Sequence, residues 1–413
     1  MTRRAGALAA GAAVCLLIVA AAVVRIRAAD GVTLGDIPTY EHAARLMRLG
    51  ALPYRDFDVE YPPGAALLFW AADLLPGRYE IAFQALMSAC ACAAAAGIVA
   101  TGRALDLPLW RVTAGAALVP ASVWMLGDLS LPRYDLAVTA LLAWLVWCAV
   151  TGRWRAAWLL MAAAVLMKLV PAALAPALLV AHLHAVPPRR AARDLAPAVA
   201  AGLAVVVPAA LAAPAGLWRS VAYHLERPLQ IESTGSALLL AAHHIGGLPV
   251  RVVRTYGSDN LEGGLPQALA TAGSLLGVAL AALLAVLLHR RLRAADGADP
   301  RYLASVLAAT LLVLIATGKV LSPQYLLWLP AVVALLPGRR GIAVLPLMLA
   351  VLWLSHRVFP VGYLGLVEEL DPRTVILLCA RDVLLVVLAA VSWPRVSRAD
   401  KGNAHAPGPF PAR

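Results

Sequence analysis

The sequence predicts an all-α polytopic membrane protein, and three observations lead to this class. The mean hydropathy is +0.79 and only 14% of the residues are charged, which excludes a soluble globular protein. Apolar runs of about 20 residues, the length that crosses a bilayer as a helix, recur along the whole chain. These runs are continuously apolar and rich in Ala and Leu, without the polar–apolar alternation of a membrane β-barrel.

The apolar runs predict a bundle of about twelve transmembrane helices, some of them shorter than a full span. Their expected ranges are 6–28, 79–101, 110–127, 134–151, 156–168, 169–184, 194–213, 267–289, 302–317, 323–337, 341–355 and 374–393. The fifth and sixth ranges have two interpretations. They are either two short helices that meet at Lys168 or one long kinked span, which would change the topology downstream.

Basic residues orient the chain in the membrane. Arginines gather in the short loops on one side of the expected bundle, around Arg103, Arg153, Arg189, Arg290 and Arg339. The positive-inside rule makes that side cytoplasmic and places both termini there. The two largest loops, about 29–78 and 214–266, are then external and carry most of the acidic residues. The net charge of +12 reflects this topology, and no clustered basic face predicts a nucleic-acid partner.

We expect a single membrane domain over residues 1–393, followed by a disordered cytoplasmic tail, 394–413. All five cysteines lie in apolar ranges, where they show neither metal-ligand spacing nor a disulfide framework. The chain also lacks a Gly-rich phosphate-binding loop. The sequence therefore predicts no metal site and no cofactor.

The first large loop contains two short helical patterns. From Pro38 to Leu49, apolar residues follow the i, i+3, i+4, i+7 spacing and charged residues occupy the other face. A second apolar stretch, 64–75, is too short to span a membrane. The first segment is typical of a helix that lies in the membrane interface, and the second either lies along the surface or re-enters the membrane.

Carboxylates, tyrosines and prolines are concentrated between Asp36 and Pro63, immediately after the first apolar run. A polar island of this composition at a membrane face indicates a catalytic surface. Asp36 lies at the start of the first short helix, where Asp is also a preferred N-cap residue. Asp36 is therefore interpreted either as a helix cap or as a catalytic carboxylate, and the two roles are compatible.

Four segments resemble a known enzyme family. They are Asp36 with Tyr40 and LPYRDFDVEYPP (52–63), RYD (133–135), HLERPLQIES (224–233) and GKVLSPQYLLW (318–328). In this order they are similar to the polyprenyl-phosphate-dependent glycosyltransferases of family 87, which have the GT-C fold and include mycobacterial mannosyl- and arabinofuranosyltransferases. The resemblance implies a catalytic acidic residue in the first external loop, for which Asp36 is the best match. The paired-acid form of some GT-C relatives is absent near Asp36, so the Asp56/Asp58/Glu60 group is the alternative source of the base.

Sugar transfer from a lipid phosphate requires a base for the acceptor hydroxyl and cations for the departing phosphate. Lys319 and Arg227 are the predicted phosphate ligands, although an isolated lysine at a helix end more often extends toward lipid headgroups. The further expected substrate-binding residues are His224, Glu60, Tyr61, Asp58, Lys168, Glu232, Gln324 and Tyr325.

Four other charged residues lie in or beside the apolar ranges. Charged groups within membrane spans are functional candidates by default. We interpret Asp135 and Arg133 as a local ion pair at a helix entry, and Arg381 and Asp382 as structural residues of the last helix.

The sequence thus predicts a membrane glycosyltransferase. It would transfer mannose or a pentose such as arabinofuranose from a polyprenyl monophosphate to a lipid-linked or cell-envelope glycan at the external face. A single catalytic carboxylate implies inversion at the anomeric carbon. The main alternative is a transporter or lipid flippase, but this would distribute charges along the membrane depth, whereas the charges here are concentrated in two loops. A non-catalytic scaffold would explain neither the acidic loop nor Lys319.

Overall fold

The structure is a computed structural model that describes residues 11, 13–20, 35–294 and 299–395. Most of the predicted first span, 6–28, lies outside the described residues, although Gly11 and residues 13–20 are helical. Nearly all of the predicted tail, 394–413, also lies outside them.

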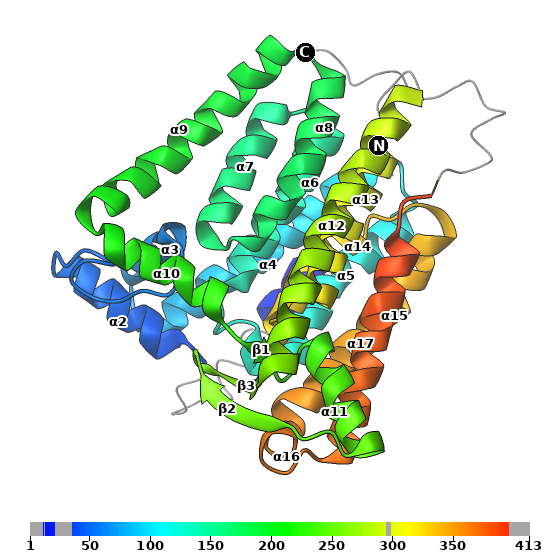
Figure 1. Cartoon of the computed structure of the whole chain (residues 1–413). Helices are drawn as coiled ribbons and strands as arrows, with labels where there is room; N and C mark the ends of the chain where they lie inside the picture. Colours follow the sequence, from blue (N-terminus) through cyan, green and yellow to red (C-terminus); the bar gives the residue numbers. More distant parts are fainter. Residues whose placement is uncertain (1–10, 12, 21–34, 295–298, 396–413) are drawn as a thin grey trace.

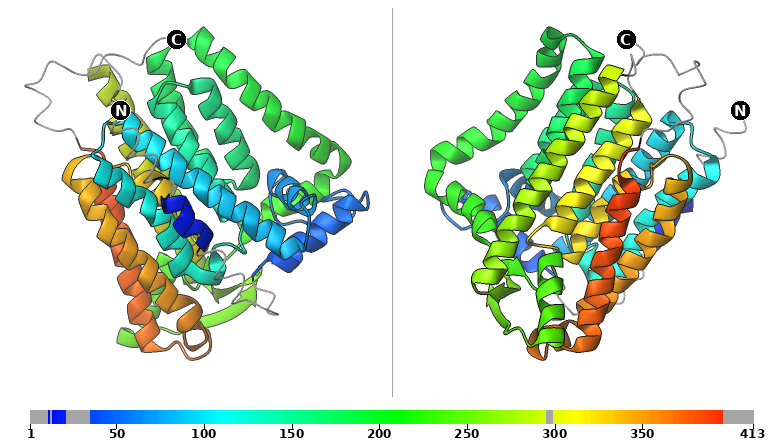
Figure 2. Two further views of the ribbon diagram at one scale, coloured as in Figure 1. Left: turned by 180° about the vertical axis from the view of Figure 1, so that it is seen from behind. Right: turned by 45° about the vertical axis from the view of Figure 1, so that its right-hand side comes forward.

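Seven helices in the described part are long and apolar enough to cross a membrane. They are α4 (Tyr79–Ala104), α5 (Leu109–Leu126), α9 (Pro188–Ala212), α12 (Gly264–Ala294), α13 (Pro300–Thr317), α15 (Gly338–His356) and α17 (Pro372–Ser392). Helix α13 is largely buried inside the bundle. Helix α9 is almost entirely exposed and stands at the periphery in every view (Figures 1 and 2).

Three shorter apolar helices complete the bundle: α6 (Asp135–Val150), α7 (Trp154–Met167) and α8 (Ala175–Ala185). Helices α7 and α8 form a hairpin. Trp158 in the first half of α7 donates a 3.0 Å hydrogen bond to Nδ1 of His182, near the end of α8, as expected for antiparallel helices. At the apex, Lys168 has an extended backbone and is followed by a 3₁₀ turn, η2 (Val170–Leu174). The structure thus shows two short helices that meet at Lys168.

The predicted span at 323–337 is wrong. This segment forms a 3₁₀ turn, η3 (Pro323–Trp328), and a single helical turn, α14 (Pro330–Val333), both buried against α5 and α6. Three prolines, at 323, 330 and 337, lack the N–H groups that a continuous helix needs. Seven candidate spans are therefore found among the described residues, where the sequence predicted about twelve in the whole chain.

The two large loops lie at the same end of the bundle, the lower part of Figure 1. The helices at that end are α2 (Ile37–Arg48), α3 (Pro63–Asp73), α10 (Pro214–Glu226), α11 (Thr234–Gly246) and α16 (Tyr363–Glu368), with the short turns η1 (Gly127–Leu129) and η4 (Arg357–Val361). The helices predicted in the first loop are thus present as α2 and α3. The apolar face of α2, which includes Tyr40 and Ala44, is buried, and α2 packs against α3.

A small antiparallel sheet in the second loop departs from the all-α prediction. Its strands are β1 (Leu229–Gln230), β2 (Arg251–Thr255) and β3 (Ser258–Glu262), in the order β1–β3–β2. Asn260 of β3 pairs with Gln230 on one side and with Val253 on the other. Strands of two and five residues are too short for an alternating pattern to be recognised in the sequence.

The basic turns meet at the opposite end of the bundle. Arg301 at the start of α13 donates to the carbonyl of Leu105 at the end of α4, at 2.9 Å. Arg340 in α15 donates to the carbonyl of Trp393 after α17, at 2.7 Å. These contacts place at one end the turns that the sequence assigned to one side.

Candidate active site

Asp36 immediately precedes α2, and its carboxylate contacts side chains from three separate parts of the chain. Its Oδ2 accepts hydrogen bonds from the hydroxyl groups of Tyr40, at 3.2 Å, and Tyr61, at 3.4 Å. The same oxygen forms an ion pair with Arg133, which lies between η1 and α6. The side chain accepts no hydrogen bond from the backbone of α2. Asp36 thus occupies the N-cap position of α2 without capping the helix through its side chain.

The aromatic rings around Asp36 pack against one another. Tyr40 stacks on Phe69 of α3 with ring centroids 4.1 Å apart, and Tyr61 meets Tyr134 edge to face at 5.5 Å. Burial raises the pKa of both Tyr40 and Tyr61. The two phenols therefore keep their protons and remain donors to the Asp36 carboxylate.

Glu60 connects the first loop to α10. Its carbonyl oxygen lies 2.9 Å from Nε2 of His224. Its carboxylate adds to the effect of burial in raising the pKa of Tyr61 and Tyr223. Burial lowers the pKa of His224, and the positive charges of Arg227 and Lys168 lower it further. Glu60 acts in the other direction and raises it. A neutral imidazole donates from Nε2 to the Glu60 carbonyl.

Arg227 and Lys319 lie close together, although they are far apart in the sequence. Arg227 donates to Oγ of Ser258 at 2.9 Å, and its guanidinium lies 5.8 Å from the centre of the Tyr223 ring. The ammonium of Lys319 donates to the carbonyl of Leu225 at 2.5 Å. Burial lowers the pKa of Lys319, and the charge of Arg227 lowers it further. Lys319 is thus directed into the second loop, and it forms a pair of cations with Arg227.

Strand β1 fixes the position of Lys319 relative to the second loop. The backbone N–H of Gln230 donates to the Lys319 carbonyl at 2.9 Å, and the Gln230 side-chain oxygen accepts from the N–H of Leu321 at 2.9 Å. Gln230 is buried, so these bonds are shielded from water. The segment after α13 is held against the second loop at this point.

Lys168 is surrounded by a carboxylate and three aromatic rings. Its Nζ lies 2.5 Å from Oδ1 of Asp135. The ring centres of Tyr134, Tyr325 and Trp328 lie 4.7, 4.8 and 5.0 Å from the same nitrogen. Rings in this position attract a cation.

The predicted local ion pair between Arg133 and Asp135 is wrong. Asp135 is buried, pairs with Lys168 and also accepts a 3.0 Å hydrogen bond from the indole of Trp328. Arg133 pairs with Asp36 instead. The two charged residues of the RYD segment therefore have different partners. Arg133 pairs with the candidate base, and Asp135 pairs with Lys168 at the apex of the α7–α8 hairpin.

Tyr325 links these groups from the 3₁₀ turn η3. It stacks on Trp328 with ring centroids 4.6 Å apart. It is also close enough to Arg133 and Tyr223 to affect the pKa values of both. Gln324 precedes it in the same turn and is half-buried.

The other carboxylates of the first loop have different partners. Asp58 is exposed and pairs with Arg219 of α10 at 3.0 Å. Asp56 is bonded to Arg55 at 2.8 Å and accepts from the backbone N–H of Leu52 at 2.8 Å. The hydrogen bond from Arg55 lowers the pKa of Asp56. Of the Asp56/Asp58/Glu60 group, only Glu60 thus lies beside the tyrosines and His224.

Glu232 belongs to a neighbouring cluster. It is buried, and burial raises the pKa of its carboxyl group to about 8. Arg381 of α17 donates to the Glu232 backbone carbonyl. It also donates to the carboxylate of Asp382 at 2.9 Å. Arg381 and Asp382 thus connect the last span to the second loop, in keeping with the structural role that the sequence suggested.

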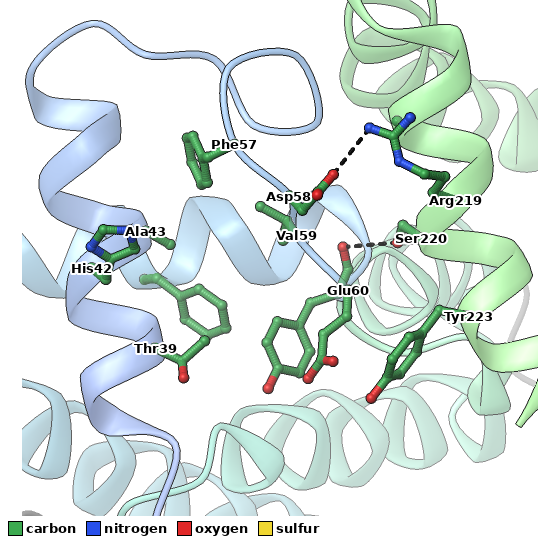
Figure 3. A pocket seen from close by; sticks show the side chains of 13 residues that line it. Thr39, His42, Ala43, Phe57, Asp58, Val59, Glu60, Arg219, Ser220 and Tyr223 are labelled. Atoms are coloured by element: carbon green, nitrogen blue, oxygen red, sulfur yellow. Dashed lines mark hydrogen bonds and ion pairs between the residues drawn. The ribbon is translucent and has the colours of Figure 1, made fainter. Parts of the chain in front are cut away.

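A pocket of about 400 Å³ lies between α2, the loop that carries Asp58, and α10 (Figure 3). Its polar lining residues come from all three segments and include Thr39, Glu60 and Arg219. Three of the lining residues, Asp58, Glu60 and Tyr61, are among the predicted substrate-binding residues, whereas Arg219 and Thr39 show no local signal of a binding role in the sequence. Among the described residues, no group of three or more His, Cys, Asp or Glu side chains could hold a metal ion.

The sequence profile of glycosyltransferase family 87 matches residues 60–323, which is more than half of the chain. The chain belongs to glycosyltransferase family 87. It is therefore a membrane glycosyltransferase. The matched range begins at Glu60 and includes Lys168, Arg227 and Lys319, whereas Asp36 precedes it. No curated protein matches the chain.

Proposed function

We propose that this family 87 enzyme transfers a sugar from a polyprenyl monophosphate to a glycan acceptor, with Asp36 as the general base. The observation that carries the proposal is the placement of Asp36, Glu60, Arg227 and Lys319 at one end of the bundle. Tyr61 contacts Asp36 and lies beside Glu60. His224, which is bonded to Glu60, is in turn affected by the charge of Arg227.

In the proposed reaction, Asp36 accepts the proton of an acceptor hydroxyl while the hydroxyl oxygen attacks the anomeric carbon of the donor. The bond between that carbon and the phosphate oxygen breaks, and its electron pair stays on the phosphate. Direct displacement by one nucleophile inverts the anomeric configuration. The tyrosines that donate to Asp36 hold the carboxylate in position for this step.

The leaving phosphate gains negative charge in the transition state, so cations that contact it stabilise that state more than the bound donor. Lys319 in the segment after α13 and Arg227 in the second loop provide a pair of cations, and Lys168 provides another at the apex of the α7–α8 hairpin. We place the phosphate between these groups. The sugar is mannose or a pentose such as arabinofuranose, and the acceptor is a lipid-linked or cell-envelope glycan at the external face.

Transfer by the purified enzyme from radiolabelled polyprenyl-phosphate mannose and polyprenyl-phosphate arabinofuranose tests this proposal. We expect Asp36→Asn to lower turnover by about 10²–10⁴-fold, the usual loss for a general base. Asp56→Asn is the matched control, because Asp56 is exposed and bonded to Arg55 in the same loop. We expect it to keep wild-type turnover.

Two results would contradict the assignment of the base. One is an Asp36→Asn enzyme that retains more than about a tenth of wild-type turnover. Its loss of turnover would then be smaller than the loss expected for a general base. The other is an inactive Glu60→Gln enzyme beside an active Asp36→Asn enzyme, which would make Glu60 the base. Wild-type protein that transfers sugar from neither donor would overturn the donor class.

A further inference from the structure

The structure assigns the pocket between α2, the Asp58 loop and α10 to the glycan acceptor, and we propose that it binds a hydroxyl-rich sugar ring. This inference rests on the proposed function. The lining residues that matter here are Thr39, Phe57, Asp58, Tyr61, Arg219 and Tyr223. Figure 3 shows their side chains around a common space.

The lining has the chemistry that a sugar requires. Sugar rings present hydroxyl groups around their edge and C–H groups on their faces. The carboxylate of Asp58, the guanidinium of Arg219 and the hydroxyl of Thr39 provide polar partners for the edge. Phe57 and Tyr61 provide aromatic surface for the faces. A volume of about 400 Å³ lies at the lower end of the range for small-molecule sites and suits one or two sugar rings.

The position of the pocket matches the geometry of the proposed displacement. Tyr61 lines the pocket and also donates to the Asp36 carboxylate. Tyr223 lines it as well, and the Arg227 guanidinium lies 5.8 Å from the centre of its ring. These two tyrosines therefore border both the pocket and the residues assigned to the base and the phosphate. An inverting reaction needs the acceptor hydroxyl, the base and the leaving phosphate at one anomeric carbon, and the pocket borders residues that contact the groups assigned to the last two.

The walls of the pocket are held together by a small number of contacts. Arg219 pairs with Asp58 across the gap between α10 and the first loop, and both side chains are mostly exposed. Exposed ion pairs of this type contribute little to stability. Nearby, α10 approaches the loop so closely that a Cβ atom on Gly216 would collide with the carbonyl oxygen of Tyr54. The pocket is thus bordered by a close backbone contact at Gly216 and by an exposed ion pair between Arg219 and Asp58.

Photolabelling of the full-length protein tests the assignment without requiring turnover. The probes are octyl α-mannopyranoside and octyl α-arabinofuranoside, each carrying a diazirine on the sugar, and the labelled peptides are identified by mass spectrometry. We expect label on α2 and α10 at the pocket. Thr39→Trp should lower it by about tenfold, because Thr39 is an exposed helix position from which an indole fills the pocket.

Arg48→Gln is the matched control, because Arg48 is exposed on the same helix and pairs with Asp73 outside the pocket lining. It should be labelled like the wild type. Both variants should still bind radiolabelled polyprenyl phosphate, which reports the phosphate site. Three results would overturn the acceptor assignment. They are label in the pocket that polyprenyl phosphate displaces, label found elsewhere in the protein, and labelling of Thr39→Trp equal to that of the wild type. Failure of the proposed function has a different signature, since the wild-type enzyme would then neither bind polyprenyl phosphate nor use the donor.

Discussion

At the scale of single residues, the ion pair between Arg133 and Asp36 has a direct consequence for catalysis. A guanidinium beside a carboxylate favours its ionised form and makes it a weaker base. We predict that Arg133→Gln shifts the acid limb of the pH–rate profile to higher pH, because the carboxylate then binds its proton more tightly. Arg55→Gln is the control, because Arg55 pairs with the exposed Asp56 of the same loop. An acid limb at the wild-type position in Arg133→Gln would show that the pair does not tune the base.

Lys319 gives a second prediction at this scale. Burial and the charge of Arg227 lower its pKa, so it loses its proton at lower pH than an exposed lysine does. We expect the affinity for polyprenyl phosphate to fall as pH rises from about 7 to about 10, below the ordinary lysine pKa of about 10.4. Lys319→Arg should keep its affinity over this range, because a guanidinium stays protonated. Parallel falls in the two proteins, measured by equilibrium binding, would exclude Lys319 as the titrating ligand.

The residue types of the candidate site could be predicted from the sequence, but their pairing could not. Charged residues concentrated in a few segments of an otherwise apolar chain attract attention, as with Asp36, Arg227 and Lys319. The partner of Asp36 is Arg133, which lies 97 residues further along the chain. The two meet because the start of α2 lies against the turn before α6. Sequence proximity suggested Asp135 as the partner of Arg133, and this was wrong.

At the scale of elements, the apex of the α7–α8 hairpin is tied to α6 by Lys168 and Asp135. Asp135 is buried, and removal of one partner from a buried ion pair costs about 3–5 kcal/mol. We predict that Asp135→Asn is strongly destabilised in thermal unfolding and that the Asp135→Asn/Lys168→Met double variant recovers much of this loss. The double variant should remain impaired in transfer, because Lys168 is proposed to contact the phosphate. Recovery of both stability and activity would make Lys168 purely structural.

The same scale shows why helix prediction succeeded for some segments and failed for others. Long apolar runs without internal breaks, such as α4 and α17, are found near their expected bounds. The run at 323–337 has the same apolar composition, but its prolines recur every seven residues and divide it into short buried turns. Hydropathy reports burial in an apolar environment, and the centre of a helix bundle satisfies that condition as well as a bilayer does.

At the scale of the whole molecule, the chain separates its charges between two ends. The basic turns meet at one end, where Arg111 of α5 donates to the carbonyl of Leu336 before α15 at 2.6 Å. The two large loops and the candidate active site lie at the other, as Figure 1 shows. Because arginine-rich short loops stay in the cytoplasm, we predict that the active-site end faces the cell exterior.

Cysteine accessibility in intact cells measures this orientation. Thr255 in β2 and Arg189 at the start of α9 are both exposed, and they lie in the second large loop and in a basic turn, respectively. With a membrane-impermeant maleimide, we expect Thr255→Cys to be labelled in intact cells and Arg189→Cys only after lysis. The wild-type protein gives the background, because its five native cysteines lie within apolar segments. Labelling of Arg189→Cys but not Thr255→Cys in intact cells would invert the topology. The base and the phosphate ligands would then face the cytoplasm, and the donor would have to carry its sugar on the inner leaflet.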